Sequence, residues 1–273
     1  MFIYAIVPGI VCAVLRSECG KVFACPWRMH STKFFCGTSG LVLPVPNKQA
    51  FPEAFRAGTR LTYYASLFNS LEVNSSFYKI PKPSTFAKWV AEVPDDFRFT
   101  VKLWRGITHV PSLAFTPEDV GRFMQAAANL RPKKGCLLIQ LPPGAKVDRA
   151  PALERLLAAI APYREAWKLA VEFRDKSWHI DATDTLLERF NAARVLQDMP
   201  ASACWEETTI ASFVYLRYHG PAGDYRGGYT KERLVSDALR IKKWLTEGKE
   251  VYVYFNNTIG SALPDAHFLM DQL

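Results

Sequence analysis

The sequence lacks the short motifs that identify many common enzyme and metal sites. Its six cysteines form no C-x-x-C pair and no Cys/His group at structural-zinc spacing. It contains no P-loop, no dinucleotide-binding glycine fingerprint, no G-x-S-x-G turn and no H-E-x-x-H sequence. We therefore predict no cofactor and no structural zinc. The unpaired cysteines are typical of reduced thiols in a cytoplasmic protein.

A long apolar run is also missing. The apolar residues near the start are interrupted by Pro8-Gly9, are not preceded by a basic segment and are too few to cross a bilayer. We predict no membrane association. For residues 1–28, a signal peptide is the less favoured interpretation. The favoured one is a non-native or misassigned extension, because Met29 offers a start immediately upstream of the recognisable domain.

Composition favours one globular domain with anionic partners. The chain has 273 residues, of which 49% are hydrophobic and 22% are charged, and we expect residues 29–273 to form a single domain. The formal net charge of +8 favours a phosphorylated metabolite, a nucleic acid or an acidic protein as partner. A generally basic surface without such a partner explains the charge equally well.

Short apolar runs recur along the chain, and several end on polar or charged residues. They predict strands at residues 33–38, 71–73, 97–101, 135–141, 168–173, 193–198, 213–219 and 250–256. Helical patterns lie between them, at residues 59–68, 85–93, 150–161, 183–190 and 231–246. Thr116-Pro117-Glu118-Asp119 has the sequence of a further helix N-terminus. Strands that alternate with helices predict βαβ units and a parallel sheet.

Several unusual motifs appear together at the ends of these strands. They are Glu72-Val73-Asn74-Ser75-Ser76-Phe77-Tyr78, Lys102 with Thr108-His109, Glu172-Phe173-Arg174-Asp175-Lys176-Ser177-Trp178, Arg217-Tyr218-His219-Gly220 and Tyr254-Phe255-Asn256-Asn257. In this order they resemble the DUF72 (YecE-like) family, from about Lys33 to the C-terminus. The resemblance implies a single TIM-type (β/α) barrel with parallel strands, and it implies no established activity. Gly37-Thr38-Ser39-Gly40 is similar to the family opening, whereas the following loop, residues 41–46, departs from it.

In a barrel of this type the loops that follow the strands converge on one face, where active sites lie. We therefore expect the polar residues at the strand ends to approach one another. They are Glu72, Asn74, Lys102, His109, Gln140, Glu172, Arg174, Arg217, His219, Asn256 and Asn257. Because side chains alternate along a strand, Glu72 and Asn74 share a face, as do Arg217 and His219.

These residue types suit an acid/base site that binds an anion. Proton transfer is assigned to Glu72, His109, Glu172 and His219. Lys102 and Arg217 would hold a phosphate or carboxylate. Asn74, Gln140, Asn256 and Asn257 would orient the ligand. The alternative is a buried network of ion pairs that only closes the barrel, and for Glu172 with Arg174 the two interpretations have equal weight.

The leading hypothesis is a protein that binds an anionic, phosphate-bearing small molecule, with acid/base turnover of that molecule as its extension. Nucleic-acid binding or processing is the first alternative, suggested by the basic balance and by aromatic residues that could stack on a base or sugar ring, which are Trp104, Trp178, Tyr218, Tyr225 and Tyr229. For Trp178 in particular, packing is the favoured interpretation. A non-catalytic partner or scaffold protein is the second. No metal site is predicted, and magnesium held by one or two carboxylates is kept as a further alternative.

Overall fold

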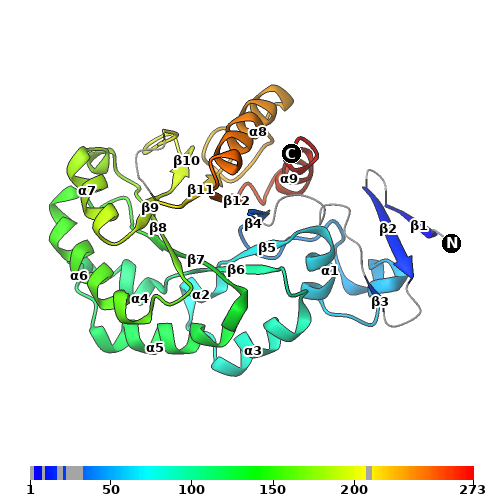
Figure 1. The fold of residues 1–273 in the computed structure, drawn as a ribbon, viewed down its shortest axis with the longest axis horizontal. Helices are drawn as coiled ribbons and strands as arrows, with labels where there is room; N and C mark the ends of the chain where they lie inside the picture. The colour runs from blue at the N-terminus through cyan, green and yellow to red at the C-terminus, as the bar shows by residue number, and fades with distance from the viewer. Residues whose placement is uncertain (1–2, 8–9, 17–20, 23–32, 207–210) are drawn as a thin grey trace.

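A computed structural model describes residues 3–7, 10–16, 21–22, 33–206 and 211–273 (Figure 1). The predicted domain boundary at Met29 lies outside the described residues. The strands are β1 (Ile3–Val7), β2 (Ile10–Arg16), β3 (Lys21–Val22), β4 (Phe34–Thr38), β5 (Ser70–Val73), β6 (Arg98–Lys102), β7 (Lys134–Gln140), β8 (Lys168–Glu172), β9 (Ala192–Arg194), β10 (Leu196–Gln197), β11 (Phe213–Tyr218) and β12 (Glu250–Phe255). The helices are α1 (Arg60–Leu67), α2 (Ser75–Tyr78), α3 (Pro83–Glu92), α4 (Arg105–Thr108), α5 (Pro117–Ala127), α6 (Ala150–Ile160), α7 (Asp181–Arg189), α8 (Lys231–Thr246) and α9 (Ala262–Asp271).

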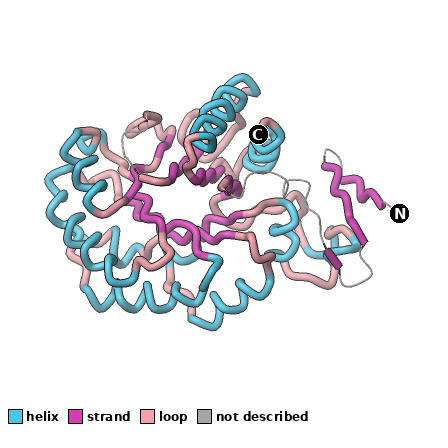
Figure 2. The backbone as a smooth tube through the Cα atoms, viewed as in Figure 1, coloured by secondary structure: helices cyan, strands magenta, loops and turns pink. Residues whose placement is uncertain are grey.

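The strands from β4 onward form two parallel sheets, in the orders β10-β11-β12-β4 and β5-β6-β7-β8-β9. Helices lie around the outside of these strands (Figure 2). The predicted α/β fold with parallel strands is confirmed. The single closed barrel is not confirmed, because the backbone ladders stop at two places and define two sheets. A separate antiparallel sheet, β1-β2-β3, is formed by the first part of the chain.

One interruption lies within a continuous piece of chain. β9 pairs with β8, and β10 pairs with β11, with Val195 alone between them. The backbone N–H of Val195 still donates to the carbonyl of Val171, at 2.9 Å. A single run of residues, 192–197, therefore passes from the edge of one sheet to the edge of the other. This explains why the predicted sixth strand appears as two short pieces.

The other interruption, between β4 and β5, is bridged by side chains and, at its end, by one backbone hydrogen bond from the N–H of Gly40 to the carbonyl of Glu72 (2.8 Å). We call it the β4–β5 seam. The Tyr64 hydroxyl accepts from the backbone N–H of Thr38 (2.7 Å) and donates to the carbonyl of Ser70 (3.1 Å). The Asn69 amide bonds the backbones of Phe34 and Cys36 across the same gap, at 2.7 and 2.9 Å. Tyr64 and Asn69 thus satisfy backbone groups that a regular ladder would otherwise pair.

Helix starts follow the local sequence. The Thr116 side chain accepts from the backbone N–H of Asp119 (3.2 Å), and Pro117 occupies the first turn of α5, as predicted. The predicted bounds of α8 match the structure. The single-turn helices α2 and α4 are not among the predicted elements, because four residues are too few to show a helical period. α9 had no counterpart in the predicted elements.

The strands from β4 onward are buried on both faces, which parallel sheets covered by helices require. One apolar cluster lies between the two sheets and includes Phe35, Leu138, Ala170, Tyr215 and Tyr254. A second, larger cluster joins the outer faces of the strands to the helices. Cys36 of β4 and Cys136 of β7 are fully buried free thiols. Burial raises the pKa of both thiols.

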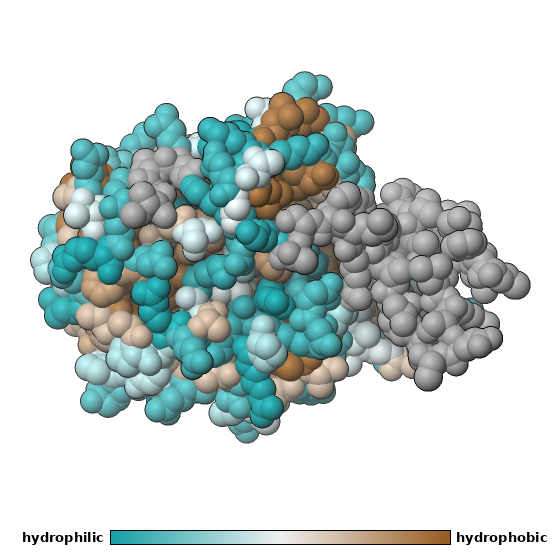
Figure 3. Space-filling view, in the orientation of Figure 1, coloured by the Kyte–Doolittle hydropathy of each residue, from teal (hydrophilic) through white to brown (hydrophobic). Residues whose placement is uncertain are grey.

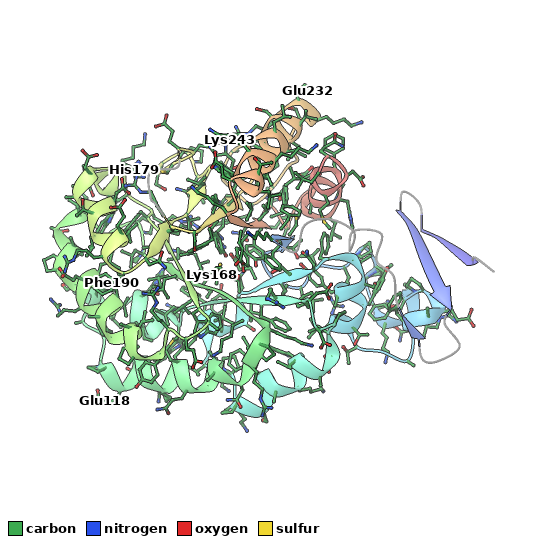
Figure 4. The ribbon with its side chains drawn as sticks, viewed as in Figure 1. Glu118, Lys168, His179, Phe190, Glu232 and Lys243 are labelled. Carbon is green, nitrogen blue, oxygen red and sulfur yellow. The ribbon has the colours of Figure 1, made fainter. Side chains whose placement is uncertain are left out.

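Outer surfaces are largely polar. Figure 3 shows hydrophilic residues over most of the visible face, with an apolar area over α8. The exposed apolar side chains of α8 are Val235 and Leu239. The labelled Glu118, His179 and Glu232 lie on the outer layer of helices and loops (Figure 4). Within the described ranges, no helix has both the length and the apolar character needed to cross a bilayer.

Candidate functional site

Buried polar side chains gather where the parallel strands end. Glu72 lies in β5, Glu172 ends β8, Arg217 lies in β11 and His219 follows it, and each of these side chains is buried. Register places Gln140 of β7 beside Glu172. The apolar cluster between the sheets lies beneath these residues, with Tyr215 two positions before Arg217 on the same face of β11. Four of the predicted site residues are therefore brought together.

The Glu72 carboxylate is held by four donors. Arg217 approaches it side-on, with Nε 3.0 Å from one carboxylate oxygen and Nη2 2.6 Å from the other. The hydroxyls of Ser39 and Tyr215 donate to the same two oxygens. Bidentate pairing with a guanidinium is among the strongest arrangements available to a carboxylate. Glu72 of β5 is thus tied to the residue that follows β4, Ser39, and to two residues of β11, Tyr215 and Arg217.

Glu172 receives two guanidiniums. Arg217 donates through Nη1 to one carboxylate oxygen, and Arg174 donates through Nε to the other. Burial by itself would raise the pKa of the Glu172 carboxyl, but Arg174 and Arg217 outweigh it and hold the pKa well below its usual range. Burial likewise opposes the charge of Arg217, and Glu172 and Glu72 overcome it and raise the Arg217 pKa. We refer to Glu72, Glu172, Arg174 and Arg217 as the Arg–Glu network.

His219 lies against this network as a neutral imidazole. Its Nε2 is 3.0 Å from Nη2 of Arg174 and 3.2 Å from Nη1 of Arg217. Since guanidiniums only donate, Nε2 must accept, which assigns the proton to Nδ1. Nδ1 faces the Asp198 carboxylate at 3.4 Å. Burial lowers the pKa of His219, which agrees with the neutral form.

Lys102 ends β6 next to the network but is not part of it. Its Nζ lies 4.1 Å from the centroid of the Phe77 ring, a cation–π contact. In the part of the chain that the structure describes, this ammonium makes no hydrogen bond or ion pair. Burial, followed by the charge of Arg217, lowers the pKa of Lys102 to about 8, although Glu172 and Glu72 act in the opposite direction.

His109 is half-buried and also contacts Phe77. Its ring lies edge-on to Phe77, with centroids 4.8 Å apart, and Nδ1 is 2.9 Å from the Thr108 hydroxyl. Burial, then the charges of Lys102 and Arg105, lowers the pKa of His109 to about 4. Several cations therefore act on this imidazole, and the potential at the mouth of the site favours anions.

The predicted amides are spread over the strand ends. Asn74 Nδ2 donates to Ser39 Oγ at 2.8 Å, and its Oδ1 is buried without a partner among the described residues. Gln140 Nε2 donates to the carbonyl of Leu141 at 3.1 Å. Asn257 donates to Asp265 and to the carbonyl of Gly227, so it holds two loops together. Its neighbour Asn256 donates through its backbone N–H to the carbonyl of Tyr218 at 2.7 Å.

Sequence reasoning missed Ser39, Tyr215 and Asp198 as members of the site. Tyr215 precedes Arg217 by two residues, so strand alternation could have placed it on the same face. Ser39 follows the first strand in the same way that Asn74 follows the second. Asp198 lies two residues after Leu196 of β10, where it accepts from the backbone N–H of His219 (2.8 Å) and from the Tyr229 hydroxyl.

Within the described residues, no group of three or more His, Cys, Asp or Glu side chains is arranged to hold a metal. The carboxylates of Glu72 and Glu172 are instead engaged by guanidiniums and hydroxyls. The magnesium alternative stays a prediction.

Replacing Tyr215 with phenylalanine should lower the free energy of unfolding by about 1–3 kcal/mol, because a buried carboxylate loses one donor while the ring stays in place. Urea denaturation measures this change. Tyr163→Phe is the matched control, since the Tyr163 ring is on the surface, and we expect its stability to change by less than about 0.5 kcal/mol. Equal stabilities for the two variants would show that the Tyr215 hydroxyl does not support Glu72.

These observations define a class of protein: an α/β fold of parallel strands with a buried Arg–Glu network at the strand ends. The sequence matches the family described as "Protein of unknown function DUF72" over residues 35–273. The chain therefore belongs to this family, which confirms the resemblance seen in its motifs.

Relatives and solved structures agree with this membership. The UPF0759 protein YecE of Escherichia coli (strain K12) is 34% identical over 110 residues, a match that spans 40% of this chain and only 40% of YecE. The UPF0759 protein YunF of Bacillus subtilis (strain 168) is 23% identical over 79% of this chain and 86% of its own length. A DUF72 family protein from Thermotoga maritima has a TM-score of 0.72 and 26% identity, covering 88% of this chain and 97% of that one. Another from Enterococcus faecalis has a TM-score of 0.74 and 21% identity, covering 88% and 95%.

Proposed function

We propose that this protein binds an anionic, phosphate-bearing small molecule at the ends of its parallel strands. The observation that carries the proposal is Lys102: an ammonium beside two buried carboxylates that pairs with neither. Both carboxylates are already engaged by guanidiniums, so the Lys102 charge is left for a ligand. A primary ammonium suits a phosphate as a point charge with three donors.

Each of the remaining residues has a role in this proposal. The two sheets act as one barrel, whose strand ends surround the ligand. Arg217 is 1% exposed, so it contributes positive charge while it holds Glu72 and Glu172 in place. Asn74 would use its unpaired Oδ1 to accept from the ligand, and Gln140, Asn256 and Asn257 are the other candidates for orienting it.

Acid/base turnover is the second candidate function. The observation that favours it is again Lys102, because a pKa of about 8 lets the amine exchange a proton near neutral pH. His109, neutral above pH 4, is the partner that lies on the same ring of Phe77. Glu72, Glu172 and His219 stay predicted proton-transfer residues, and a cytoplasmic location also stays a prediction.

Anion affinity should fall as the pH rises through about 8. Lys102 carries its charge below that pKa and loses it above, so binding that needs the ammonium weakens roughly tenfold per pH unit on the alkaline side. Isothermal titration calorimetry with ribose 5-phosphate between pH 7 and 10 measures this dependence. The phosphate itself is fully ionised over most of that range.

Two variants make this experiment specific. Lys102→Arg should bind with an affinity that hardly changes between pH 7 and 10, because a guanidinium keeps its charge throughout. Lys102→Ala should lose most of the affinity at every pH. If the unmodified protein binds ribose 5-phosphate equally well at pH 7 and pH 10, or if Lys102→Ala binds normally, Lys102 is not the anion-binding group.

A further inference from the structure

A surface groove of about 550 Å³ opens beside the strand ends of β5 and β6. One wall is formed by the segment that runs from Tyr78, at the end of α2, to Pro83. The other wall is formed by α5, and Trp104 also lines the groove. The volume falls within the usual range for small-molecule sites. The groove does not contain the Arg–Glu network, and Trp104 in its lining follows Lys102 by two positions in the chain.

Trp104 and Arg122 form a flat, charged platform in this groove. The Arg122 guanidinium lies over the Trp104 ring, 5.4 Å from its centroid. On its benzo side the indole presses on Gly106, where an added Cβ would lie 2.4 Å from the nearest ring atom. The ring is therefore fixed by its neighbours. A stacked guanidinium still presents a planar outer surface, which pairs well with aromatic rings.

Tyr78 supplies a second ring. Its side chain is 67% exposed, although it is large and apolar. It packs edge-on against Phe77, with centroids 5.2 Å apart, and the Lys102 ammonium lies on Phe77 at 4.1 Å. The Phe77 ring thus lies between the Tyr78 ring, which lines the groove, and the Lys102 ammonium, which we assign to anion binding.

The charges of the groove also point to an anion. Lys79 and Arg122 are its charged lining residues, and no acidic side chain lines it. Arg122 has an exposed ion pair with Asp119 at 2.8 Å, which leaves its guanidinium face available. Pro81, Pro83 and Ile80 add apolar surface. The site therefore combines two aromatic groups, apolar walls and two cations.

We propose that this groove binds the base of a nucleotide, between Tyr78 and the Arg122–Trp104 platform, while the phosphate lies toward Lys102. A nucleobase has the planar π-surface that such a platform stacks on, and its phosphate suits the positive charge. The proposal rests on the proposed anion site for the phosphate only, because the base contacts belong to the groove.

Calorimetry with four probes tests this assignment: ribose 5-phosphate, adenosine, AMP and a ten-residue oligothymidylate. AMP should bind at least tenfold more tightly than ribose 5-phosphate, which lacks the base. Tyr78→Ala should remove most of that advantage and leave the affinity for ribose 5-phosphate unchanged. Tyr78→Phe keeps the ring and should bind AMP as the unmodified protein does. Leu239→Ala, equally exposed but on α8, is the surface control.

The probes separate the two proposals. If adenosine binds and this binding needs Tyr78, while ribose 5-phosphate does not bind, the groove is supported and the anion site at Lys102 is refuted. Ribose 5-phosphate that binds as tightly as AMP, or Tyr78→Ala with an unchanged ratio of the two, would overturn the groove. Binding of none of the base-bearing probes would overturn it too. Oligothymidylate that binds much more tightly than AMP would identify a single strand, rather than a free nucleotide, as the source of the base.

Discussion

Replacing Arg217 with methionine is expected to lower the free energy of unfolding by about 3–5 kcal/mol. The variant would leave Glu72 with only the hydroxyls of Ser39 and Tyr215, and Glu172 with only Arg174, in a site from which water is excluded. Leaving one buried charge without its partner costs more free energy than the intact ion pair contributes to stability. Thermal unfolding should shift downward by roughly 10 °C, and urea denaturation should show the same loss.

The free energy of unfolding of Arg217→Met should also depend on pH in the opposite direction to that of the unmodified protein. In the unmodified protein the pKa of Glu172 is depressed below its usual 4.5, so its contribution to stability is complete above that value and is lost as the pH falls further. Without Arg217, protonation of a buried carboxylate removes an unpaired charge. Stability should therefore rise as the pH falls from 7 toward 5.

An exposed ion pair provides the control for Arg217. Arg189 pairs with Glu154 on the surface, where the two side chains are 58% and 40% exposed. Arg189→Met should change stability by less than about 1 kcal/mol, because such pairs are screened by solvent. A loss at Arg217→Met no larger than this would show that the Arg–Glu network is dispensable for folding.

Replacing Gly37 with alanine is expected to destabilise the fold by about 3 kcal/mol, because the β4–β5 seam has no room for a methyl group. A Cβ at Gly37 would lie 2.0 Å from the carbonyl oxygen of Ser70 and 2.7 Å from the Tyr64 hydroxyl. Relief of this overlap must move β4 away from β5 and stretch the bonds that Tyr64 makes to Thr38 and Ser70. Urea denaturation followed by circular dichroism measures the loss.

Gly144→Ala is the matched substitution. An added Cβ at Gly144 meets nothing within 4 Å, so this variant should be unchanged or slightly more stable, because alanine restricts the unfolded chain. If the Gly37→Ala variant proved as stable as the Gly144→Ala variant, the seam could open without a loss of stability. Tyr64 and Asn69 would then not be needed to join the sheets.

Much of the fold and of the inner site was predictable from local pattern. Apolar runs that end on charge placed Glu72, Glu172 and Arg217 at strand ends, and a parallel arrangement then brings those ends together. The same reasoning identified Lys102 and His219. It works because both the alternation along a strand and the direction of parallel strands are properties of short segments.

The rest depends on contacts between distant segments. Nothing near Tyr64 in the sequence shows that its hydroxyl replaces a backbone ladder, so the division into two sheets could not be foreseen. Arg217 pairs with both buried carboxylates and Lys102 pairs with neither, and this difference depends on how the strands place the two cations. The groove at Tyr78 exists only because α5 brings Arg122 over Trp104. Each of these follows from the packing of elements, which no local pattern encodes.

The pairing of β4 with β12 bears on how the chain is made. β5 to β9 pair with successive neighbours, so their sheet can assemble while translation continues. β4 has its ladder partner in β12, which is separated from it by most of the chain. Contacts between such distant segments form slowly, because a long loop must close first. On the ribosome, β4 must therefore wait with an unpaired edge until the last strand emerges, which makes this edge the place where a chaperone would be of most use.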